Sequence, residues 1–110
     1  MIELTICNYL SQKLDCQVLP EKPKRPFGKM VFVERTGGKG RFLRETTIAI
    51  QSYGTSMYEA AELNEEVIKY MNQIVELDEI TRVDLNQNYN FTDTNTKEYR
   101  YQAVFDIYHY

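Results

Sequence analysis

The sequence predicts an α+β fold, in which an antiparallel or mixed sheet of four to five strands carries two helices packed on one face. In two segments apolar residues recur with the helical period, and in the segments predicted as strands apolar and polar residues alternate. Hydrophobic residues make up 43% and charged residues 26% of the 110 residues, which is ordinary globular usage. A chain of this length forms one core, so we expect a single domain over residues 1–110.

The first helix is predicted over residues 2–14, where apolar residues recur every three or four positions. A short strand is expected at residues 16–19. The stretch CQVLPEKPKRPFG then contains three prolines, which exclude a helix. We expect this basic stretch to be extended and to lie along an edge of the sheet.

A hairpin is predicted next, because KMVFVERT and RFLRETTIAIQSY are both rich in β-branched and aromatic residues. The letters GGKG between them indicate the turn, with glycines at positive φ. A phosphate-binding loop is the alternative for TGGKGR. That loop requires a Lys-Ser/Thr pair opening a helix, whereas strands are predicted on both sides here.

The second helix is predicted over residues 54–74, GTSMYEAAELNEEVIKYMNQI, where the helical period is clearest. Ser56 and Glu59 have the spacing of a capping box, in which the hydroxyl accepts a backbone N–H and the carboxylate reaches back to the cap residue. The helix is therefore expected to begin near Ser56.

Two further strands are predicted at the end of the sequence, ITRVDLNQNYNF and YRYQAVFDIYHY, with TDTNTKE as the turn. In the first of them the alternation predicts a half-buried strand. Its apolar side is expected to carry Val83, Leu85, Tyr89 and Phe91. In the last strand the side expected to face the core carries Tyr99, Tyr101, Ala103, Phe105 and Ile107.

Charge is strongly segregated along the sequence. Between Lys22 and Arg44 there are eight bases and one acid, Glu34, which gives this segment a net charge of +7. Because the whole chain has a net charge of −3, the remaining residues together carry −10. Such a split favours head-to-tail association of copies, or docking on an oppositely charged partner.

Metal and catalytic chemistry find little support in the sequence. Cys7 and Cys16 lie nine residues apart with a single histidine elsewhere, so a zinc site is not indicated and free buried thiols are expected rather than a disulfide. His109 has Asp106 on the opposite side of the predicted strand, so we expect it to pack at the surface or an edge. Five carboxylates on or beside the second helix are expected to form a solvated acidic face: Glu59, Glu62, Glu65, Glu66 and Glu76.

Targeting signals are also not indicated. The first ten residues contain an acid, Glu3, with no basic residue before it, and the apolar runs are short and interrupted by charge. We expect neither a signal peptide nor a membrane span.

The basic proline-rich stretch and the hairpin allow a nucleic-acid-binding interpretation. Phe27 and Phe42 are available to stack on bases, and six bases could contact phosphates: Lys22, Lys24, Arg25, Lys39, Arg41 and Arg44. The alternative is a projecting hairpin that meets an acidic neighbour in an assembly. The second interpretation is favoured, because the remaining −10 would repel nucleic acid unless the basic face were well separated from it.

The order of these features, and above all YNFTDTNTKEYRYQAVFDIY, resembles the small tail-completion proteins of long-tailed bacteriophages and prophages, the group of tail terminators and tail-to-head joining proteins. The likeness extends over nearly the whole chain, as an order of elements more than as a motif. It includes the proline-punctuated basic stretch, PEKPKRPFGKMVFVE, and the hairpin RTGGKGRFLRETTIAIQSYG.

The resemblance implies a sheet backed by helices and a structural role in the virion tail, with assembly in the host cytoplasm. Copies would form a hexameric ring on the finished tail tube, stop its polymerisation and present a surface to the head connector, and nucleic acid would only pass through the ring. The role implies no catalysis and no cofactor. A head-closure or connector component is the close alternative, and a small nucleic-acid-binding module is the alternative from another class.

Ring formation needs two complementary patches on each copy. On this hypothesis the basic hairpin contacts the acidic side of the next copy or of the tube through Lys39, Arg41 and Arg44. The outward side of the last strand would meet a neighbour through Arg100, Tyr108 and Tyr110, since arginine and tyrosine suit such contacts.

Overall fold

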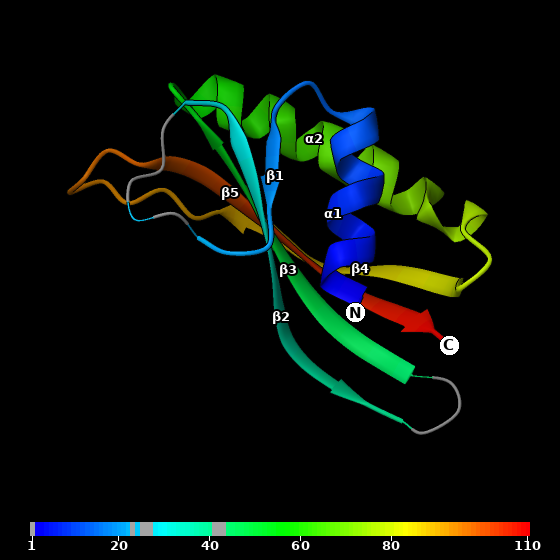
Figure 1. Cartoon of the computed structure of the whole chain (residues 1–110). Helices are drawn as coiled ribbons and strands as arrows, with labels where there is room; N and C mark the ends of the chain where they lie inside the picture. The colour runs from blue at the N-terminus through cyan, green and yellow to red at the C-terminus, as the bar shows by residue number, and fades with distance from the viewer. Residues whose placement is uncertain (1, 23, 25–27, 41–43) are drawn as a thin grey trace.

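The computed structural model describes residues 2–22, 24, 28–40 and 44–110, which form a sheet with two helices and one 3-10 turn (Figure 1). Its dimensions are 43 × 24 × 22 Å. In chain order the elements are α1 (Ile2–Lys13), β1 (Gln17–Leu19), β2 (Met30–Lys39), β3 (Arg44–Gly54), α2 (Met57–Gln73), η1 (Ile74–Glu76), β4 (Ile80–Asn90) and β5 (Tyr99–His109).

The five strands form one mixed sheet in the order β1-β2-β3-β5-β4. Only β1 and β2 are parallel, and every other neighbouring pair is antiparallel. Both helices pack on the same face of this sheet, which we call the helix face. The α+β class, the number of strands and the placement of the helices are confirmed.

The main core lies between the helices and the helix face. Phe105 and Ile107 of β5 are fully buried there against Ile6 and Leu10 of α1 and against α2. Burying one side chain of this size contributes about 1.5–3 kcal/mol. The other face, the outer face, has a small second cluster, in which Leu19 packs on Met30, Phe32 and Tyr53.

The start of α2 is set by its cap and by a glycine. The Ser56 hydroxyl accepts the Glu59 backbone N–H at 3.1 Å, as predicted. The Glu59 carboxylate reaches one residue further back than the capping box requires, to the backbone N–H of Thr55 at 2.8 Å. At Gly54 a Cβ would lie 2.6 Å from the Ala60 backbone nitrogen, so only glycine lets β3 end this close to the helix.

The two hairpin strands remain paired over the residues that were predicted to form the turn. Gly37, Gly38 and Lys39 belong to β2 and do not form the turn, and among the described glycines of this region only Gly40 has positive φ, at 101°. A register shift between Arg35 and Gly37 takes up one residue in the strand. Pairing resumes after this bulge and continues to Lys39, so the paired part of the hairpin is longer than predicted.

The prediction for the proline-rich stretch falls partly outside the described residues. Pro23 and residues 25–27 are not described, and the same is true of residues 41–43 in the hairpin. An edge position for the whole stretch therefore stays a prediction.

The alternation predicted for β4 is wrong, because the strand contains two bulges, between Ile80 and Arg82 and between Leu85 and Gln87. Leu85 pairs with Phe105 on the helix face, but beyond the second bulge Tyr89 pairs with Gln102 on the outer face. Each extra residue reverses which side chains face the core. The strand is mostly exposed rather than half-buried.

In β5 the predicted core face is confirmed for its second half only. Ala103, Phe105 and Ile107 are fully buried, whereas Tyr99 and Tyr101 are half-buried. The expectation that His109 packs at the surface or an edge is wrong, since it is 7% exposed and continues the buried face.

Candidate interaction surface

The β2–β3 hairpin extends past the helices and forms a projection at one end of the molecule (Figure 1). Its two strands pair from Met30 and Tyr53 out to Lys39 and Glu45. Within the described residues the outer half of β2 has no strand on its other side, because β1 pairs only with residues 30–32. β3, in contrast, pairs with β5 along its whole length, from Arg44 with His109 to Gly54 with Tyr99. This end of the hairpin, which we call the arm, is therefore a corner of the sheet whose open edge is the outer half of β2.

A basic cleft lies on this arm. Its volume is about 390 Å³, and it is lined by Arg35, Gly38, Lys39, Gly40, Arg44 and Thr46. All three bases are exposed. Within the described part of the chain Lys39 pairs with Glu45 at 3.3 Å, whereas Arg35 and Arg44 make no ion pair. The two guanidinium groups are therefore available to an acidic partner.

Tyr108 belongs to a row of side chains that crosses the outer face beside the arm. Its hydroxyl donates to the Glu45 carboxylate at 3.2 Å, and the Arg82 guanidinium stacks on its ring at 5.4 Å. Partial burial and the hydrogen bond to Glu45 raise the pKa of the Tyr108 hydroxyl. Because Glu45 also pairs with Lys39, the structure brings two of the predicted contact residues, Lys39 and Tyr108, into one network.

Tyr110 and Arg44 lie together at the same end of the molecule. They line a small pocket of about 110 Å³ with His109, Glu79, Ile2 and Thr5. Tyr110 is 73% exposed, and its backbone N–H donates to the carbonyl of Glu79 at 3.1 Å.

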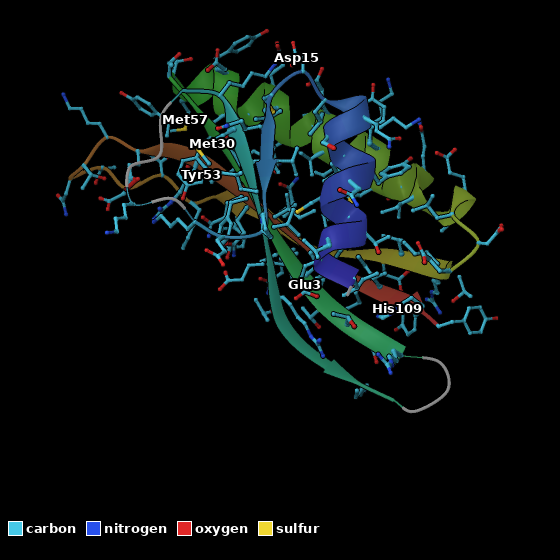
Figure 2. All side chains as sticks on the ribbon, in the orientation of Figure 1. Glu3, Asp15, Met30, Tyr53, Met57 and His109 are labelled. Atoms are coloured by element: carbon cyan, nitrogen blue, oxygen red, sulfur yellow. The ribbon has the colours of Figure 1, made fainter. Side chains whose placement is uncertain are left out.

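His109 itself is held by hydrogen bonds. Its Nε2 lies 2.7 Å from the Thr46 hydroxyl and its Nδ1 3.2 Å from the Tyr110 carbonyl. The backbone oxygen only accepts, so Nδ1 is the donor of the bond to Tyr110. Figure 2 shows His109 near Glu3, where α1 begins. The histidine thus anchors β5 to β3.

Arg100 is placed apart from the other predicted contact residues, at the opposite end of β5. Its side chain is only 13% exposed and donates to the Phe91 carbonyl at 2.7 Å and to the Tyr53 hydroxyl at 3.3 Å. The guanidinium also lies 4.6 Å from the Phe91 ring centre. These contacts hold the β4–β5 hairpin on the sheet and leave little of Arg100 for a partner. Arg41 lies outside the described residues.

A second groove was not anticipated from the sequence. It has a volume of about 390 Å³ and lies along the first turns of α2, lined by Tyr58, Ala61, Glu62, Glu65 and Tyr101. The spacing of residues 58, 62 and 65 was the available signal, since these positions share one side of a helix. The contribution of Tyr101 depends on the packing of β5 beside α2.

Both thiols lie in surroundings that disfavour the thiolate. Burial raises the pKa of both Cys7 and Cys16 to about 11, and both cysteines are free. Cys7 is buried as predicted, while Cys16 is half-buried. In the described ranges no group of three or more His, Cys, Asp or Glu residues could hold a metal ion.

Neither helix of the described chain is both long and apolar enough to cross a membrane. A scan against protein-family models and a search of curated proteins returned no match. The functional assignment therefore depends on the resemblance in the sequence, on the fold and on the charged surfaces.

Proposed function

We propose that this chain is a structural protein of a phage or prophage virion, a tail terminator. Copies of it form a hexameric ring that caps the tail tube, ends its polymerisation and joins the tube to the head connector. The protein acts in the virion tail after assembly in the host cytoplasm, and DNA only passes through the ring. This role requires no cofactor and no turnover.

The projecting basic arm is the observation that carries this proposal. On the arm, the outer half of β2 has no further strand beside it within the described chain, so this charged edge of the sheet is open to another molecule. Arg35 and Arg44 are exposed there without an ion pair in the described residues. A ring subunit needs such a projecting patch to reach its neighbour or the tube. The helix-backed sheet also agrees with the fold that the resemblance implies.

Purified tail tubes from the parent virus test the proposal. The protein is mixed with tubes that lack their natural cap and viewed by negative stain, and tube length is followed while tube protein is still polymerising. We expect rings at one tube end and arrested growth. Reversing Arg44 to Glu should weaken capping, while the Lys22→Glu variant, with the same change of charge outside the arm, should cap normally.

Two outcomes would reject the tail terminator. Tubes that stay uncapped and keep growing, with binding to DNA-filled heads instead, would indicate a head-closure component. A duplex-DNA shift that falls steeply with salt, with no effect on tubes, would indicate the nucleic-acid-binding alternative.

A further inference from the structure

The groove on α2 has the chemistry of a site for arginine. Tyr58 is 77% exposed on one wall, and Tyr101 of β5 contributes a second aromatic ring. Glu62 and Glu65 are exposed and make no ion pair within the described ranges. A guanidinium binds well where it can stack on a tyrosine ring and donate to a carboxylate.

The basic cleft of the arm supplies the matching groups. Arg35 and Arg44 line it without an acidic partner in the described chain. The two surfaces are therefore complementary in charge, with two guanidinium groups on one and two carboxylates on the other.

A single molecule cannot join its own two surfaces. Arg44 begins β3 and Gly54 ends it, and α2 starts at Met57. Tyr101 lines the groove and pairs with Ser52, so eight steps of about 3.3 Å separate it from Arg44 by about 26 Å along the axis of β3. Figure 1 shows the start of β3 and the start of α2 at opposite ends of that strand. Contact between them must come from another copy.

We propose that Arg35 and Arg44 of one copy dock into the groove formed by Tyr58, Glu62 and Glu65 of the next. The contact joins two different patches at opposite ends of the chain, so it is head-to-tail and repeats from copy to copy. It rests on the proposed function, for which it specifies the contact between ring subunits. It does not involve the tube or the head connector.

Charge reversal tests the contact in two variants. One carries Arg35→Glu and Arg44→Glu and has an acidic arm; the other carries Glu62→Lys and Glu65→Lys and has a basic groove. Sedimentation velocity measures self-association over a concentration series at low and at high salt. We expect each variant to associate at least about tenfold more weakly than the unmodified chain, because each apposes like charges.

Mixing the two variants is the decisive measurement. The acidic arm of one fits the basic groove of the other, and the basic arm of the second fits the acidic groove of the first. Alternating copies can then close an even-numbered ring, so the mixture should regain the association that each variant lost. Variants with matched charge changes elsewhere serve as controls, Lys22→Glu with Lys24→Glu and Glu21→Lys with Asp78→Lys, and should associate normally.

Several results would overturn the contact. These are an unmodified chain that stays monomeric at every concentration, reversed variants that associate normally, or a mixture that remains dissociated. Loss of DNA binding by the acidic-arm variant with unchanged self-association would overturn it as well. If the protein still caps tubes when any of these results is found, the contact between copies is wrong but the proposed function stands. Failure of the contact can therefore be distinguished from failure of the proposed function.

Discussion

Replacing Phe105 by alanine should be among the most damaging single changes in this protein, and replacing Tyr101 should be much milder. Both aromatic rings lie on the same side of β5, but Phe105 is 0% exposed in the core whereas Tyr101 is half-buried beside α2. Removing a fully buried phenylalanine costs about 3–5 kcal/mol, including the cavity left behind. Partial burial limits the cost at Tyr101 to about 1–2 kcal/mol.

The expected shift in melting temperature follows from the length of the chain. Unfolding entropy of about 2.1 cal/mol/K per residue gives about 0.23 kcal/mol/K for 110 residues, so each kcal/mol lowers Tm by about 4 °C. Phe105→Ala should therefore lose about 12–20 °C and Tyr101→Ala about 4–8 °C. Thermal and urea unfolding followed by circular dichroism measure both, with Phe105→Leu as a control that keeps most of the volume. Equal losses at the two positions would refute the described packing of β5.

Three other changes have definite expected outcomes. Gly54→Ala should cost about 2 kcal/mol or more by forcing β3 and α2 apart, whereas Gly37→Ala, where an added Cβ meets nothing within 4 Å, should cost less than about 1 kcal/mol in urea unfolding. Ser56→Ala removes the cap of α2 and should cost about 1 kcal/mol, with Ser56→Asp retaining most of the stability. Burial raises the pKa of Cys7 and Cys16 from 9.0 to about 11, so these thiols contribute stability that is full below pH 9 and is lost as the pH rises from 9 through 11. The free energy of unfolding of a variant with both cysteines replaced by alanine should therefore fall less steeply over this pH range. An identical pH profile for the variant and the unmodified chain would contradict the raised pKa of the thiols.

Local pattern was sufficient for most of the fold. The helices, the short strand before the prolines and the cap at Ser56 each depend on residues within one or two turns, and all of them appear where the sequence predicts them. The alternation of β5 also places Phe105 and Ile107 correctly, since a central strand without a bulge keeps its two-residue period.

What the sequence could not predict depends on contacts between strands. A bulge is an extra residue relative to a partner, so no period within β4 itself reveals that Tyr89 changes sides after Leu85. For the same reason Gly37 and Gly38 resembled a turn although pairing continues beyond them. His109 resembled a surface residue because Thr46, its hydrogen-bond partner, is 63 positions away in the sequence.

For the candidate surfaces too, local features could be predicted from the sequence, whereas features that depend on strand pairing could not. The basic charge of the arm could be read from composition, since Lys39 and Arg44 lie in one run of bases. The sequence did not reveal that Arg100 lies far from Lys39 and Arg44. That separation depends on the antiparallel pairing of β5 with β3, which places Arg100 opposite Tyr53.

The position of β5 also has a consequence for biosynthesis. It is the last strand in sequence, yet it lies between β3 and β4 and is the only neighbour that β4 has in the described sheet. While the ribosome still holds residues 99–109, β3 has one open side and β4 has nothing to pair with. The nascent chain therefore cannot complete its sheet stepwise from the amino terminus, and the final ordering of both strands must wait for the release of those eleven residues.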